Sequence, residues 1–87
     1  MIMKNVVGRK VKLARMLKNP PMTQQELATQ LQLVGFEINR SGIAKIEAGI
    51  RQVRDVEALR LAEALQVEIS WLFEDTNLWV QNELNNI

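Results

Sequence analysis

Apolar residues recur every three or four positions along most of the chain, which is the spacing of amphipathic helices. The first stripe belongs to a predicted helix over residues 8–18 and consists of Val7, Val11, Ala14 and Leu17. Further helices are predicted over residues 24–31, 40–48 and 55–65, the last with a stripe formed by Val56, Leu59, Ala62 and the flanking Leu61 and Leu65. A short last turn is expected to place Trp71, Leu72 and Phe73 in the core. The pattern predicts an all-α fold.

Polar residues at the starts of two of these segments mark helix N-termini. Thr23 precedes Glu26 by three residues, the spacing at which a hydroxyl and a carboxylate satisfy each other's backbone N–H groups. Asn39 is the second predicted N-cap, with Ile38 and Ile43 as the apolar pair that packs across it. Two adjacent and independently capped helices are typical of a helix-turn-helix.

The predicted helix over residues 40–48 has two different sides. Its apolar stripe, Ile43, Ile46 and Ile50, is expected to face the core, and Gly49 is expected to end it in the left-handed conformation. A glycine in a helix interior costs about 1 kcal/mol relative to alanine. Gly42 therefore indicates either a close approach, to DNA or to a neighbouring helix, that needs the absence of a side chain, which we favour, or a helix that is weaker at this point. The opposite side presents Arg40, Ser41, Ala44 and Lys45.

Two irregular segments separate the first three helices. Asn-Pro-Pro at 19–21 should end the first helix, because proline cannot donate the next backbone hydrogen bond. Residues 32–37 form an excursion in which Gly35 is expected to supply a turn conformation. Val34 and Phe36 are apolar, and we expect them to pack against the domain beside the helix cap.

The 87 residues suit one small domain, and a content of 47% hydrophobic and 24% charged residues is typical of a globular protein. We assign residues 1–74 to this domain, with 1–6 as a frayed arm, and residues 75–87 to an amphipathic tail.

The absence of cysteine and histidine excludes disulfides, thiolate zinc sites and histidine-based catalysis. We expect no cofactor and no enzymatic activity. Without a signal peptide or a long apolar run, a cytoplasmic protein with no membrane contact is expected.

Charge is distributed unevenly along the chain. Residues 1–54 contain ten Lys or Arg and three acidic residues, a net charge of +7, whereas residues 55–87 contain one basic and seven acidic residues, a net charge of −6. One interpretation is a solvated surface with incidental asymmetry. The other is a chain whose basic part faces a polyanion such as nucleic acid.

Several segments together resemble a known family. The runs TQQELA, RSGIAKIEAG, LRLAEALQV and WLF are similar to those of Cro/lambda-repressor-type helix-turn-helix proteins, also called the XRE family, over about residues 7–73. The resemblance implies a compact five-helix, lambda-repressor-like DNA-binding domain. It also implies double-stranded DNA as the partner, with the helix over residues 40–48 in the major groove.

The resemblance, with the rule that a recognition helix reads bases through its N-terminal side chains, assigns roles to individual residues. The residues expected to contact bases are Arg40, Ser41, Ala44 and Lys45. Those expected to contact the sugar-phosphate backbone are Gln24, Gln25, Asn39, Arg51, Gln52 and Arg54. The family's ion pair between its first and third helices corresponds to Arg15 and Glu47.

The chain departs from the family's pattern at residues 32–37, at Arg54, which replaces a hydroxyl cap, and at Gln66. Residues 32–37 lengthen the turn of the helix-turn-helix. If they bulge outward, the recognition helix can still dock, whereas if they push the two helices apart it cannot. Gln66 replaces a closing glycine, so strain is expected at that helix end. Asp55 is the expected N-cap of the fourth helix, and Ser70 that of the last turn.

Two functions of different classes follow. The first is a sequence-specific DNA-binding transcriptional regulator, a repressor that covers its operator. The second is an antitoxin-like or adaptor module that keeps the helix-turn-helix as a scaffold and holds a protein partner through Trp79 and its neighbours. For the tail, residues 75–87, two interpretations stay open: it closes back on its own domain, or it forms a homodimer with a second copy.

Overall fold

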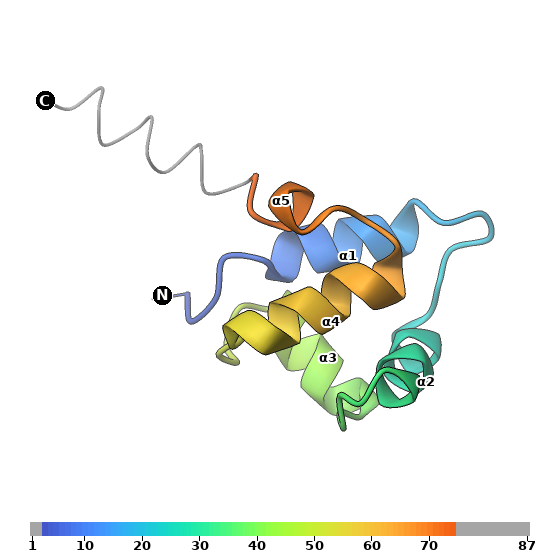
Figure 1. Ribbon diagram of the computed structural model, residues 1–87, viewed down its shortest axis with the longest axis horizontal. Helices are drawn as coiled ribbons and strands as arrows, with labels where there is room; N and C mark the ends of the chain where they lie inside the picture. The colour runs from blue at the N-terminus through green and yellow to red at the C-terminus, as the bar shows by residue number, and fades with distance from the viewer. Residues whose placement is uncertain (1–2, 75–87) are drawn as a thin grey trace, which may run out of the picture.

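The computed structural model describes residues 3–74, and within them the chain forms helices and loops only (Figure 1). The helices are α1 Gly8–Met16, α2 Gln24–Leu33, α3 Arg40–Glu47, α4 Asp55–Leu65 and α5 Ile69–Leu72. The all-α prediction is confirmed. None of these helices combines the length and apolar character that a membrane span requires. The expectations for the tail, residues 75–87, fall outside the described part of the chain.

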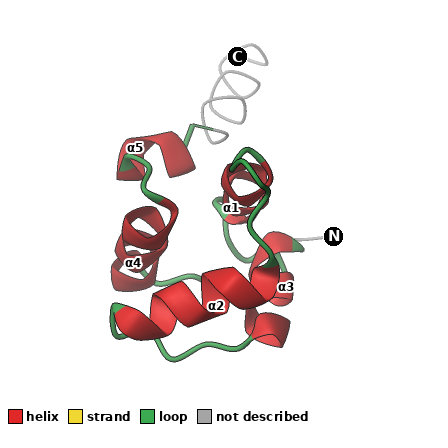
Figure 2. Cartoon of the chain, turned by 90° about the vertical axis from the view of Figure 1, so that its right-hand side faces the viewer, coloured by secondary structure: helices red, strands yellow, loops and turns green. Residues whose placement is uncertain are grey.

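The five helices enclose one hydrophobic core. α2 and α3 lie at one end of the domain and α5 at the opposite end, with α1 and α4 running between them (Figures 1 and 2). Every one of the five contributes apolar side chains to the interior. The largest fully buried side chains are Leu27, Leu31, Ile43, Ile46, Leu61, Leu65, Leu72, Val7 and Val11.

Some predicted core residues lie at the surface instead. α1 ends at Met16 rather than at residue 18, because the prolines at 20 and 21 cannot donate to the carbonyls of Met16 and Leu17. Leu17 is consequently 68% exposed. Ile50 is also exposed, because Gly49 turns the chain away from the α3 stripe with a φ of 77°.

α4 is rotated relative to the prediction. Its core-facing residues are Ala58, Leu61, Ala62 and Leu65, whereas Val56 and Leu59 are exposed. Leu61 and Leu65 occupy the interior together with two alanines, so the apolar stripe that faces the core is not the one predicted from Val56 and Leu59. In the last turn only Leu72 is fully buried; Trp71 is half-buried and Phe73 exposed.

The caps at the helix-turn-helix agree with the prediction. Thr23 Oγ1 accepts from the N–H of Glu26, and the Glu26 carboxylate accepts from the N–H of Thr23, both at 3.0 Å. Asn39 Oδ1 accepts from the N–H of Gly42 at 2.8 Å. A Cβ on Gly42 would lie 2.6 Å from Cγ1 of Ile38, so the close approach at this glycine is to the buried residue before the cap.

Residues 32–37 do not separate the two helices of the motif. α2 continues through Leu33, two residues beyond the prediction, and Gly35 turns the chain with a φ of 89°. Val34 packs against the core and Phe36 is buried. The excursion therefore lengthens α2 by half a turn and returns its apolar side chains to the domain, which leaves α2 and α3 in contact.

The predicted frayed arm is ordered over residues 3–6. The Asn5 side chain is buried, and its Oδ1 accepts from the N–H groups of Val7 at 3.0 Å and Gly8 at 2.7 Å. Its Nδ2 donates to the carbonyls of Ile46 at 3.1 Å and Arg51 at 2.8 Å. One fully paired amide thus joins the start of α1 to the end of α3 and the loop beyond, which is why this segment is held.

The N-caps of α4 and α5 lie one and two residues before the predicted caps, Asp55 and Ser70. Arg54 is the N-cap of α4, and its N–H donates to Glu57 Oε1 at 3.0 Å; Asp55 is the first helical residue. Glu68, rather than Ser70, precedes α5. Burial raises the pKa of Glu57, but hydrogen bonds from the Arg51 side chain and the Arg54 N–H outweigh it, so the pKa lies below its ordinary value.

A buried ion pair joins three helices. Arg15 Nε and Nη2 donate to the two carboxylate oxygens of Glu47 at 2.7 and 2.9 Å, and Arg15 Nη1 donates to the Met22 carbonyl at 2.8 Å. Gln24 Nε2 donates to the same carboxylate at 3.0 Å. The two charged side chains are only 9% and 5% exposed. The hydrogen bonds with Glu47 raise the pKa of Arg15 against the opposing effect of burial.

We predict strong coupling between Arg15 and Glu47. Arg15→Met or Glu47→Leu alone should lower the free energy of unfolding by about 3 kcal/mol, because each leaves a buried charge without its partner, and the double variant should recover much of the loss. A double-mutant cycle in urea should give a coupling of about 2–4 kcal/mol. The exposed Arg60–Glu63 pair, 3.0 Å apart, is the control and should give less than about 0.5 kcal/mol. A coupling near zero for Arg15 and Glu47 would contradict the prediction.

The stabilising effect of Glu57 should depend on pH. Because its folded-state pKa is depressed, its contribution is complete above the ordinary pKa of 4.5 and is lost as pH falls through the lower, folded-state value. Glu57→Gln should therefore cost about 1–2 kcal/mol near pH 7, where a charged cap is removed. Urea unfolding of both proteins at about pH 7 and about pH 3 measures this. The difference between them should shrink in acid; a difference that stays constant is the contrary result.

Candidate nucleic-acid interface

α3 turns its polar side outward. Arg40, Ser41 and Lys45 are exposed and Ala44 is half-buried, whereas Ile43 and Ile46 on the opposite side are fully buried. The apolar stripe holds the helix on the core through contacts with α1 and α2. As a result, the four residues predicted to contact bases share one solvent-facing surface, which we call the α3 face.

Residues 32–37 and Trp71 both leave the α3 face uncovered. Val34 and Phe36 of the excursion pack against the core. Trp71 lies beside α1, with its indole ring against Lys10 Nζ at 3.7 Å from the ring centroid. Residues beyond 74 lie outside the description. The α3 face is therefore open within residues 3–74.

The residues predicted to contact phosphates surround the α3 face unequally. Gln25, Asn39, Gln52 and Arg54 are exposed. Asn39 uses its Oδ1 as the α3 cap, and Gln24 is half-buried with its amide donating to Glu47. Gln24 thus has a structural hydrogen bond that the sequence did not predict.

The lysines and arginines fall into two groups. Five are held by acceptors within the domain: Lys10 by Glu74, Arg15 by Glu47, Arg51 by Glu57, Arg60 by Glu63, and Lys18 by the carbonyl of Leu65. The other six are exposed and form no salt bridge among residues 3–74; these are Lys4, Arg9, Lys12, Arg40, Lys45 and Arg54. All six belong to the basic part of the sequence. The charge available to a polyanion is thus concentrated in residues 1–54.

Arg51 has neighbours that the sequence analysis missed. Its Nη1 donates to Glu57 Oε1 at 3.2 Å and to the Gln52 carbonyl at 2.9 Å, and its Nη2 donates to Glu57 Oε2 at 3.4 Å. Its guanidinium carbon lies 5.7 Å from the centroid of the Phe36 ring. The three-residue spacing from Arg54 to Glu57 is a capping signal that points to Glu57. No local pattern relates Phe36 to Arg51.

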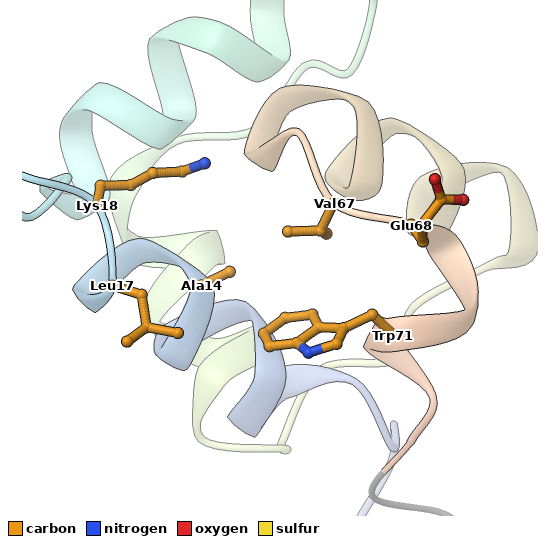
Figure 3. A pocket seen from close by; sticks show the side chains of 6 residues that line it. All are labelled: Ala14, Leu17, Lys18, Val67, Glu68 and Trp71. Carbon is orange, nitrogen blue, oxygen red and sulfur yellow. The ribbon is translucent and has the colours of Figure 1, made fainter.

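The domain also contains an apolar cleft away from the α3 face. Its volume is about 370 Å³, and it lies between the end of α1 and the start of α5 (Figure 3). Trp71 extends across it toward Ala14 and Leu17, with Val67 on a further side. None of its lining residues comes from α2 or α3. Among the described residues there is no cluster of acidic side chains that could hold a metal ion.

Comparison with known proteins agrees with this architecture. The helix-turn-helix family matches residues 11–72, a span that begins inside α1 and reaches the end of α5. No curated protein and no solved structure matches the chain. The matched span covers well over half of the sequence and includes both capped helices and the α3 face. The chain belongs to the Cro/lambda-repressor-like family of DNA-binding helix-turn-helix regulators.

Proposed function

We propose that this protein binds a specific double-stranded DNA sequence and represses transcription by covering its operator. The observation that supports this most directly is the α3 face, where two cationic side chains, Arg40 and Lys45, are exposed without acidic partners among residues 3–74. A helix of this size fits the major groove of B-DNA. On a two-fold operator, a homodimer would place two copies of α3 about 34 Å apart.

Base reading is assigned to the first two turns of α3. Arginine and lysine pair best with O6 and N7 of guanine, which suits Arg40 and Lys45. Ala44 supplies a methyl group for contact with a thymine methyl, and the Ser41 hydroxyl can donate or accept. These four side chains would distinguish bases, because each lies on the exposed side of the helix.

Positioning on the duplex is assigned to the rim of the α3 face. Arg54 and Gln52 follow α3, and Gln25 lies in the first turn of α2, where free backbone N–H groups favour an anion. Contacts of this kind to the sugar-phosphate backbone fix orientation without reading sequence. Because Gln24 and Asn39 already have internal hydrogen bonds, their contribution would come through their remaining amide atoms and the helix N-termini.

A second function, an adaptor or antitoxin-like module, is favoured by one observation. The cleft between α1 and α5 is lined mainly by apolar side chains, and Leu17 at its edge is largely exposed. An apolar partner segment would fit there without touching the α3 face. This function predicts no dependence on DNA.

DNA binding by the full chain should depend steeply on salt. Each phosphate neutralised contributes about 0.9 to the log–log slope, so about five contacts should weaken binding to random duplex DNA by several hundredfold between 50 mM and 200 mM salt. Fluorescence anisotropy with a labelled random duplex measures this. If no binding is detected even at the lower salt, the DNA-binding proposal fails and the adaptor function is favoured.

Arg40→Ala should relax sequence preference. After selection of a preferred site from a random duplex library, the variant should lose about 1–3 kcal/mol of discrimination at one base pair while keeping most of its affinity for random DNA. Lys12→Ala removes the same charge from the exposed side of α1 and is the matched control; it should leave the ratio of specific to random binding unchanged. Equal effects of both variants on both DNAs would show that Arg40 does not read a base.

A further inference from the structure

The loop after α3 is held by two segments that are distant in sequence. Glu57 of α4 accepts two hydrogen bonds from the Arg51 guanidinium, and Phe36 of the excursion lies beneath the same group. The Arg51 and Glu57 side chains are 30% and 18% exposed, so this ion pair is partly shielded from water. The two hydrogen bonds and the ring together define the plane and direction of the guanidinium, and the Arg51 side chain remains partly exposed.

The hydrogen-bond geometry leaves one edge of Arg51 free. A guanidinium has five N–H donors, and three of those of Arg51 are used, two on Nη1 and one on Nη2. Nε–H and the second N–H of Nη2 have no partner among residues 3–74. These two donors are parallel, and they form the same edge with which Arg15 grips Glu47. This free edge matches two oxygens of a phosphate.

The buried Arg15 shows the contrast. There the carboxylate occupies the Nε and Nη2 edge and the remaining nitrogen donates to a backbone carbonyl, so no forked edge remains for a ligand. In Arg51 the carboxylate occupies the Nη1 and Nη2 edge instead. Of these two pairs, the Arg15 pair fills the Nε and Nη2 edge, whereas the Arg51 pair leaves that edge open to a phosphate.

Resting on the DNA-binding function proposed above, we infer that Glu57 and Phe36 are positioning residues, which hold Arg51 so that its free edge binds a backbone phosphate. A long arginine side chain otherwise loses rotamer freedom on binding, and prior fixation removes that cost. The excursion at residues 32–37 thereby gains a role, because it supplies the ring on which the guanidinium rests. Without Glu57 and Phe36, Arg51 would still carry its charge but not its orientation.

Glu57 could also act on DNA binding through its negative charge, and this effect has the opposite sign to the positioning of Arg51. A carboxylate close to DNA repels phosphates, and by charge alone Glu57→Gln should tighten binding to every duplex. Positioning predicts weaker binding, and only while Arg51 is present. The two effects differ in sign and in their dependence on Arg51, so a double-mutant cycle distinguishes them.

The experiment uses the full chain as wild type, Glu57→Gln, Arg51→Ala and the double variant, with a random-sequence duplex at two salt concentrations. Arg51→Ala should weaken binding about five- to tenfold and lower the salt slope by about 1. Glu57→Gln should weaken binding about threefold in the wild type and not at all in the Arg51→Ala background. Arg51→Lys keeps the charge but not the forked edge, and in that background Glu57→Gln should also have no weakening effect.

Phe36→Leu is the second test, because it leaves the helix cap at Glu57 intact. Phe36→Leu should weaken DNA binding about twofold in the wild type and not in the Arg51→Ala background. If Glu57→Gln does not fold, the inference is tested with Phe36→Leu. Thermal unfolding of each protein confirms that the folded form is compared.

Three outcomes would overturn the inference while leaving DNA binding in place. In these outcomes Glu57→Gln tightens DNA binding equally in the wild type and in the Arg51→Ala variant, weakens it equally in the two, or leaves the affinity of both unchanged. The first would mean simple repulsion and the second a general structural effect. If the wild type itself shows no salt-dependent binding, the proposed function fails together with this inference, and the two kinds of failure are thus distinguished by the wild-type measurement.

Discussion

The buried pair of Arg15 and Glu47 is the interaction on which the arrangement of the helices depends. It joins α1 to α3, and the same carboxylate and guanidinium also bind Gln24 and the carbonyl of Met22 at the start of α2. Three helix segments are thus held by charged groups that would be costly to bury apart. The pair also removes the acidic residue of α3 from the outward surface, which leaves that surface polar and cationic.

The excursion between α2 and α3 is compatible with the motif because its apolar residues turn inward. Phe36 is 7% exposed and joins the same core as Ile43 and Ile46, so the additional residues are accommodated beside the two helices rather than between them. The same ring lies beneath Arg51. Residues 32–37 therefore do not disrupt the helix-turn-helix. They connect the turn between α2 and α3 with the loop that follows α3.

Net charge is a poor guide to what this domain offers a polyanion. The chain carries a net charge of only +1, yet its acidic side chains pair with some of its lysines and arginines and not with others. Arg15 and Arg51 form salt bridges within the fold, whereas Arg40, Lys45 and Arg54 are exposed and form none among the described residues. The local field at the α3 face is set by this division rather than by the total.

The sequence by itself determined the features whose atoms lie within a few residues of one another. The capping box at Thr23, the Asn39 cap and the helix end at Gly49 follow from short spacings that the backbone dictates. The spacing of apolar residues predicted the all-α class, and the family resemblance added the five-helix, lambda-repressor-like arrangement. Only the tertiary structure decided which apolar residues stay outside, how Asn5 joins α1 to α3, and that Phe36 and Glu57 meet at Arg51. Those contacts join residues far apart in the chain, and they depend on how the helices rotate against the common core, which local spacing does not specify.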